Sequence, residues 1–138
     1  MIEPKRITFL QRLQNLLLYC KIITEEEVES LNSQMYDELV HGLLSVLSAQ
    51  MIQIVLYGST ARGDADADSD IDIAIFVSSR LTSRQQDQLS ELIVDLNLKY
   101  NKVFSVVDID QQTYLKWRSV TPFYQNVDRE GVVLWKAA

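Results

Sequence analysis

The feature that most constrains the fold is a pair of apolar runs joined by a short polar segment at residues 54–77. This stretch reads IVLYGSTARGDADADSDIDIAIFV, so Gly58-Ser59 ends the first run and Asp70-Ile71-Asp72 opens the second. Apolar residues alternate through the second run, and a period of two is typical of a strand. The pattern predicts two strands joined by a tight polar turn, with two carboxylates on one strand face.

The rest of the chain has mainly helical spacing, interrupted by further strands. A capping box of Thr24 and Glu27 predicts a helix start near Glu25. Helices are expected over residues 5–20, from about 25 to 48, over 83–100, and over most of 110–130 with a break near Thr121-Pro122. Strands are expected at residues 52–57, 71–77, 102–109 and 132–135. This order predicts a small α/β or α+β domain in which helices cover a mixed sheet.

Length and composition are typical of one soluble domain. The chain has 138 residues, with 47% hydrophobic and 23% charged. We expect a single domain over residues 1–138, with a helical part at 1–50 and the sheet with its helices at 51–138. No apolar run is long enough for a membrane span, and the N-terminus lacks the pattern of a secretory signal. Cys20 is the only cysteine, which excludes an internal disulfide and agrees with a cytoplasmic location.

The formal net charge of −6 argues against general nucleic-acid binding, which usually requires a basic face. An acidic balance suits a basic protein partner or a site in which carboxylates bind metal ions. The alternative is that the charge only keeps the protein soluble. His41 has no second His or Cys nearby in the sequence, so it is expected to be an ordinary helix residue.

The two carboxylates of Asp70 and Asp72 are suited to divalent cations. Side chains two residues apart on a strand share a face and lie roughly 6–7 Å apart. Carboxylates at this spacing can converge on a pair of Mg²⁺ ions, the arrangement used for in-line displacement at phosphorus. Without a cation, two buried acids would repel each other and the pKa of one would rise.

The polar turn offers groups that bind phosphate. Gly58 allows a close backbone approach, and the nearby N–H groups together with the hydroxyls of Ser59 and Thr60 can hold phosphate oxygens. Arg62 adds a planar cation suited to phosphate. Taken alone, the same residues also fit an ordinary turn from a strand into a helix.

Three further acids, Asp64, Asp66 and Asp68, continue the alternation within the turn. An EF-hand loop requires glycine at its sixth position and glutamate at its twelfth, and counting from Asp64 or from Asp66 meets neither requirement. These acids are therefore expected to form a solvated loop surface.

Together, Gly58-Ser59 and Asp70-Ile71-Asp72, separated by residues 60–69, resemble the signature of the DNA polymerase β-type nucleotidyltransferase superfamily. The match is most similar to its minimal nucleotidyltransferase (MNT) branch, with which residues 59–63 and 69–72 agree in type. The closing segment at residues 130–135 is compatible with the same branch. The resemblance implies the nucleotidyltransferase fold, here with additional N-terminal helices.

The resemblance also implies an activity, namely Mg²⁺-dependent transfer of AMP from ATP to a hydroxyl with release of pyrophosphate. By position, Asp70 and Asp72 would bind the metal ions, Gly58 and Ser59 would hold the β- and γ-phosphates with Thr60 beside them, and Arg62 would lie nearby. In many members of this branch the enzyme is the antitoxin of a pair. It silences a HEPN-domain ribonuclease toxin by adding AMP to a tyrosine.

The superfamily usually supplies a third carboxylate from the next strand. Asp108, which ends the apolar run of that strand, is the favoured candidate for a catalytic and metal-binding role. Strands of this kind often carry two acids three residues apart, and in that register Ser105 takes the catalytic position instead. Ser105 there would leave the nucleophile weakly activated.

Two alternative functions remain beside the antitoxin hypothesis. One is nucleotidyl transfer to a small molecule such as an aminoglycoside, and the other is a non-catalytic antitoxin that neutralises its partner by binding. The sequence leaves open whether the chain forms a homo-oligomer or a hetero-oligomer with the toxin.

Overall fold

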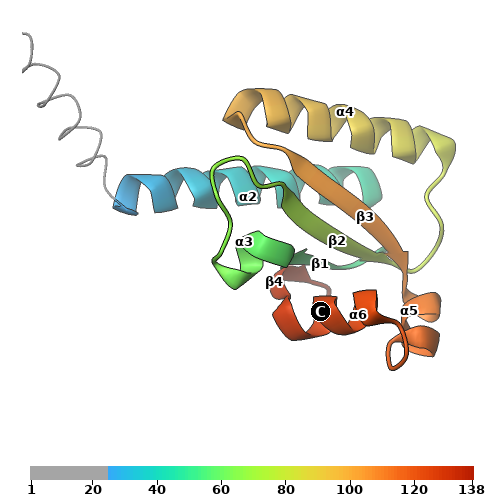
Figure 1. Ribbon diagram of the computed structural model, residues 1–138. Helices are drawn as coiled ribbons and strands as arrows, with labels where there is room; N and C mark the ends of the chain where they lie inside the picture. Colours follow the sequence, from blue (N-terminus) through green and yellow to red (C-terminus); the bar gives the residue numbers. More distant parts are fainter. Residues whose placement is uncertain (1–24) are drawn as a thin grey trace, which may run out of the picture. The chain divides into compact units, whose positions relative to one another are not determined.

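Figure 1 shows the computed structural model, which describes residues 25–138. The chain divides into two units, Met1–Gln34 and Met35–Ala138. The described part of the first unit is the beginning of helix α2 (Glu25–Leu47), whose first residue agrees with the predicted helix start near Glu25. The second unit contains the rest of α2 and all the elements that follow. The helix expected over residues 5–20 and Cys20 lie outside the described residues.

The second unit is built on a sheet of four strands. These are β1 (Met51–Tyr57), β2 (Ile71–Val77), β3 (Phe104–Asp110) and β4 (Val132–Lys136). Their order in the sheet is β3-β2-β1-β4, with β1 antiparallel to both β2 and β4 and with β2 parallel to β3. The predicted mixed sheet is therefore confirmed.

The second unit also contains four more helices: α3 (Gly58–Arg62), α4 (Ser83–Tyr100), α5 (Gln111–Trp117) and α6 (Pro122–Glu130). A capping box at the start of α4 satisfies backbone donors that a helix end leaves unpaired. The break between α5 and α6 falls where the sequence predicted it, with Pro122 in the first turn of α6. Helix α3 differs from the expectation, because a short helix begins where a tight polar turn was expected. Strand β3 also begins at Phe104, two residues later than expected.

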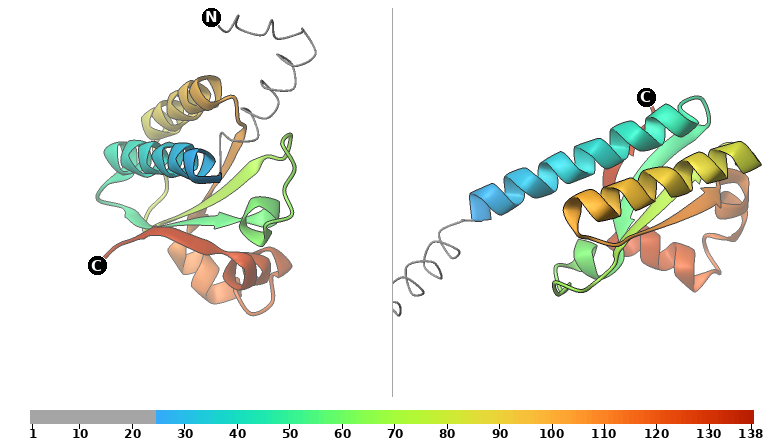
Figure 2. Two further views of the ribbon diagram at one scale, coloured as in Figure 1. Left: turned by 90° about the vertical axis from the view of Figure 1, so that its left-hand side faces the viewer. Right: turned by 90° about the horizontal axis from the view of Figure 1, so that it is seen from above.

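The two faces of the sheet carry separate cores, because side chains alternate along each strand. On one face, alternate residues of β2 from Ile71 to Val77 pack with α4 and with the part of α2 that follows Gln34. On the other face, Ala74 and Phe76 pack with Tyr114 of α5 and Val127 of α6. Figure 2 shows the resulting layers, with α4 on one side of the sheet and α5 and α6 on the other.

Candidate active site

Asp72 is the second residue of β2 and lies on the sheet face that carries α5 and α6. It pairs with Tyr57 of β1 and with Ser105 of β3, and its side chain is half-buried. Asp70 comes just before the strand and is exposed. Burial raises the pKa of Asp72, and the charge of Asp70 raises it further, while Arg62 opposes the shift. The structure thus brings the two expected carboxylates close enough to repel each other.

Gly58 makes room for the carboxylate of Asp72. Its φ angle of +75° is one that residues with a side chain rarely adopt. A Cβ atom at this position would collide with Oδ2 of Asp72. The backbone at the start of α3 therefore lies directly against this carboxylate, and only glycine permits that approach.

Ser59 and Thr60 follow in α3 and are half-buried. Helix α3 contacts β1, β2 and α6, so both residues lie at the end of the sheet that carries Asp72. The carbonyl oxygens of Ser59 and Thr60 accept backbone hydrogen bonds from Asp64 and Gly63, which close the short helix. The expected phosphate-binding residues are therefore gathered in one short helical turn beside the Asp72 carboxylate.

Arg62 is held by two carboxylates. Its Nη1 donates to Oε2 of Glu130 at 3.0 Å, and its Nε donates to Oδ2 of Asp64 at 3.3 Å. Glu130 is the better covered partner, with its side chain 19% exposed. Sequence reasoning did not assign Glu130 a role, although it opens the closing segment that supports the family resemblance.

The parallel register of β2 and β3 decides which residue of β3 lies beside Asp72. Asp72 is paired with Ser105, whereas Asp108 is paired with Ile75, about 10 Å further along the strand. Asp108 is exposed and lies on the sheet face of Phe104 and Val106, opposite to the face of Asp72. The structure therefore does not bring Asp108 to the carboxylate pair, and Ser105 takes that place.

The acids of the connecting loop are exposed, as predicted for a solvated loop surface. Asp66 orders the loop, since its Oδ1 accepts hydrogen bonds from the backbone N–H of Asp68 and from the hydroxyl of Ser69. His41 is an exposed residue of α2 whose ring is hydrogen-bonded to the Asp37 carbonyl, which confirms its ordinary role.

A row of aromatic rings lines the site on the α6 side. Tyr57 and Phe123 meet edge to face with ring centroids 5.6 Å apart, and the row continues through Tyr124 and Tyr114 to Phe76. Burial, and then the charge of Asp72, raise the pKa of Tyr57. Tyr57 was expected in the core, and it is half-buried with its ring packed at the edge of the site.

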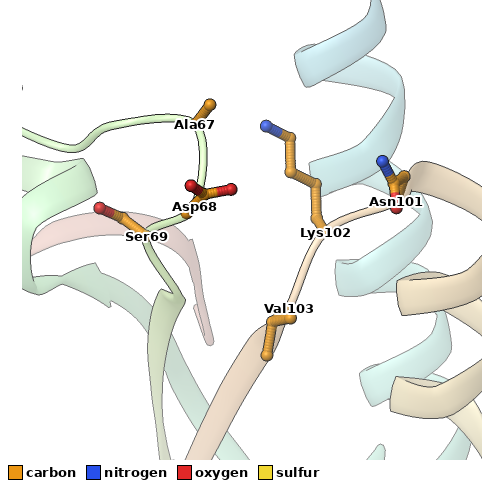
Figure 3. A pocket seen from close by; sticks show the side chains of 6 residues that line it. All are labelled: Ala67, Asp68, Ser69, Asn101, Lys102 and Val103. Carbon is orange, nitrogen blue, oxygen red and sulfur yellow. The ribbon is translucent and has the colours of Figure 1, made fainter.

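A polar cavity of about 230 Å³ lies between the segments that lead into β2 and β3. Figure 3 shows its lining, which comes from the loop before β2 and the loop before β3: Ala67, Asp68, Ser69, Asn101, Lys102 and Val103. The two loops are joined by a 2.8 Å hydrogen bond from the Ile71 N–H to the Val103 carbonyl. The cavity therefore begins one residue before Asp70.

The carboxylate pair fits Mg²⁺ as a ligand set. Mg²⁺ commonly binds one or two carboxylates together with substrate phosphates and waters. Asp70 and Asp72 supply the carboxylates, and the missing side chain of Gly58 leaves room for Oδ2 of Asp72. Within residues 25–138, no group of three or more His, Cys, Asp and Glu side chains is placed to hold a metal ion. A metal ion bound here would therefore take its remaining ligands from substrate oxygens and water.

Solved structures with a similar fold include nucleotide-dependent transferases. A chain in the crystal structure of a toxin–antitoxin with AMP-PNP is 25% identical, with a TM-score of 0.52 over 74% of this chain and 73% of that chain. In the structure of a tri-AMPylated Shewanella oneidensis HEPN toxin in complex with an MNT antitoxin, the identity is 22% and the TM-score 0.50. This match covers 76% of this chain and 72% of that chain.

Spectinomycin adenyltransferase from Enterococcus faecialis, solved with ATP and spectinomycin, is 15% identical with a TM-score of 0.63. The match covers 77% of this chain and 56% of that chain, and at this identity it shows the fold alone.

The family assignment rests on the sequence as well as on the fold. No curated protein sequence matches the chain. Among residues 25–138, no helix has the length and apolar character to cross a membrane. The family model described as Polymerase beta, Nucleotidyltransferase matches residues 43–137, which include the sheet and every residue of the site. The chain therefore belongs to the polymerase β-type nucleotidyltransferases, and the predicted family of transferases is confirmed.

Proposed function

We propose that this protein is an Mg²⁺-dependent adenylyltransferase that moves AMP from ATP to a hydroxyl of a partner protein. The observation that carries the proposal is the close approach of Gly58 to the Asp72 carboxylate, beside Asp70. This contact supports the proposal because it joins the turn that would bind phosphate to one of the two carboxylates that would bind metal. A similar chain occurs in a complex solved with AMP-PNP, which supports ATP as the nucleotide.

Each residue of the site would have a separate role in the transfer. Backbone N–H groups at Gly58 and the hydroxyls of Ser59 and Thr60 would hold the β- and γ-phosphates, with Arg62 adding positive charge nearby. Asp70 and Asp72 would hold Mg²⁺, which when bound neutralises charge on the phosphate oxygens. The acceptor oxygen forms a bond to the α-phosphorus while the bond from that phosphorus to the bridging oxygen breaks. Pyrophosphate leaves, and the hydroxyl proton passes to water.

The proposed partner is a HEPN-domain ribonuclease toxin, and the proposed acceptor is one of its tyrosines. The relatives that support this partner were solved as toxin–antitoxin complexes, one of them with the HEPN toxin tri-AMPylated. The protein would then act as the antitoxin, in the cytoplasm. Its acidic net charge of −6 is complementary to a basic, RNA-cleaving partner.

The test is transfer of labelled AMP. The protein is incubated with α-labelled ATP, Mg²⁺ and the product of the neighbouring gene, and label on that product is the expected result. A partner that forms a stable complex but carries no label contradicts the transferase proposal. Label on an aminoglycoside in place of the partner would support the small-molecule alternative.

One observation favours a second candidate function, neutralisation by binding alone. Ser105 lies beside Asp72, where the resemblance implies a third carboxylate that helps to deprotonate the acceptor. A serine at this position leaves the acceptor weakly activated. Complex formation without labelling, and loss of toxicity in the presence of Asp72→Asn, would support this candidate.

A further inference from the structure

The strand order gives the proposed transfer site two distinguishable sides. Strand β2 carries the carboxylates and lies between β1, which leads into the phosphate-binding turn, and β3. In-line displacement requires the attacking and leaving oxygens on opposite sides of the phosphorus. If pyrophosphate leaves on the β1 side, the acceptor hydroxyl must approach from the β3 side. This step rests on the proposed function.

The cavity shown in Figure 3 opens on that β3 side. Its wall includes Ser69, which precedes Asp70, and the residues that lead into β3. At about 230 Å³ the cavity is smaller than a typical pocket for a complete small-molecule ligand. It has room for one or two side chains of a polypeptide rather than for a second nucleotide.

Lys102 gives this cavity a specific chemistry. It is half-buried, and it is the only cation among the residues that line the cavity. Its ammonium group forms no ion pair or side-chain hydrogen bond with any residue in the described part of the chain. Asp68 on the facing wall makes no ion pair with it at 4.0 Å or less, so both charges remain available to a ligand.

We propose that this cavity is the acceptor subsite, and that Lys102 binds a carboxylate of the partner polypeptide next to its acceptor hydroxyl. The cavity wall carries one ammonium group, from Lys102, and one carboxylate, from Asp68. This lining can bind a single acidic side chain, but it disfavours a polyanion such as a triphosphate. Lys102 is thus a positioning residue, because it holds the acceptor segment and touches no reacting atom.

Steady-state transfer of AMP to the partner tests this assignment through the separate Michaelis constants for partner and for ATP. Lys102→Ala is expected to raise KM for the partner about tenfold, the loss typical of one charge-assisted hydrogen bond. Lys102→Glu is expected to raise it further, and Lys102→Arg to restore it. The kcat value and KM for ATP are expected to remain unchanged.

Lys116→Ala is the matched control, because Lys116 is an exposed lysine of α5 that lies over the Trp117 ring. It removes the same charge from the chain and is expected to leave KM for the partner unchanged. An equal effect of Lys116→Ala and Lys102→Ala would overturn the proposal, since it would show a general effect of charge. A rise in KM for ATP with Lys102→Ala would also overturn it, because the cavity would then serve the nucleotide.

Failure of the proposed function gives a different result. If the wild-type chain binds its partner but transfers no AMP, the dissociation constant of the complex replaces KM as the readout. A weaker complex with Lys102→Glu, and an unchanged one with Lys116→Glu, would still support the acceptor subsite. An unchanged complex with both variants would overturn it.

Discussion

The two faces of the sheet differ in what they bury. The face under α4 and α2 is closed by aliphatic side chains such as Leu43, Ile73 and Ile75, all of them fully buried. The opposite face carries aromatic rings and hydrogen-bonded polar groups, and at one end it carries the half-buried Asp72. The comparison indicates that the first face mainly stabilises the fold, whereas part of the second face is occupied by residues of the candidate site instead of core residues.

The largest expected effect is on the second face. Asp72→Asn is expected to lower AMP transfer by roughly 10³-fold or more, because it removes a charged ligand from the proposed metal pair. The same change is expected to raise the melting temperature by a few degrees in the absence of Mg²⁺. The measurements are labelled-AMP transfer and thermal unfolding of both proteins.

The pH dependence gives the sign of that stabilisation. Burial and Asp70 raise the pKa of Asp72 above 3.8, so the folded state disfavours its ionised form. The resulting destabilisation of the folded state is present at pH values above the raised pKa, and it disappears as the pH falls through that pKa toward 3.8. The melting temperatures of Asp72→Asn and wild type are therefore expected to converge in acid. A difference that grows as the pH falls would contradict this account.

The next effect belongs to the aliphatic face. Leu43→Ala is expected to lower the free energy of unfolding by about 3 kcal/mol, because Leu43 is fully buried in that core. Leu98→Ala is the matched control, since Leu98 is 78% exposed and its truncation should cost less than about 0.5 kcal/mol. Denaturant unfolding measures both. Transfer per folded molecule is expected to stay near wild type with Leu43→Ala, and a large loss would show that the two faces are coupled.

Gly58→Ala is expected to affect both stability and transfer. The added Cβ displaces the Asp72 carboxylate, and a shift of this kind can cost about 10²-fold in rate. Gly63→Ala is the control that separates the effect of backbone strain from the effect of displacing the Asp72 carboxylate. Gly63 also has a positive φ angle, +79°, but its Cβ would meet no atom within 4 Å. Both variants are expected to lose about 1–2 kcal/mol of stability, and only Gly58→Ala to lose transfer.

A smaller effect is expected within the aromatic row. The Tyr114 hydroxyl donates to Asp128, and burial together with this bond raises the pKa of Tyr114 to about 12. Tyr114→Phe is expected to cost about 1 kcal/mol in the free energy of unfolding. Tyr124→Phe is the control, because its ring packs on Tyr114 at 5.5 Å and no residue of the described part bonds its hydroxyl. Equal losses would mean that the hydrogen bond contributes nothing.

The strands and helices were predictable because their signals are local. The alternation from Ile71 to Val77 gave the strand with its bounds, the capping box of Thr24 and Glu27 gave the start of α2, and helical spacing gave the bounds of α4. Gly58 was recognised as a position that needs a close approach, although the group that approaches it, Asp72, was not identified. The ion pair of Arg62 with Glu130 joins residues far apart in the chain, and no local pattern reports such a pair.

The register of β3 against β2 is the part of the site that local signals left open. Strand β3 contains both Ser105 and Asp108. Its sequence, an apolar run that ends in acids, does not show which of the two residues lies beside Asp72. The choice depends on backbone hydrogen bonds between the strands, among them the one from Ile71 to the Val103 carbonyl just before β3. A one-residue change in that pairing would move every side chain of β3 to the other face.

Asp108→Asn therefore carries the smallest expected effect and the most direct test of this register. With Asp108 exposed and paired with Ile75, the change is expected to leave transfer and stability near wild type. Ser105→Asp is the complementary variant, because it places a carboxylate beside Asp72 and is expected to increase transfer to the partner when Mg²⁺ is present. Loss of transfer with Asp108→Asn, and no gain with Ser105→Asp, would mean that Asp108 supplies the third carboxylate. The site would then have to draw on both faces of the sheet.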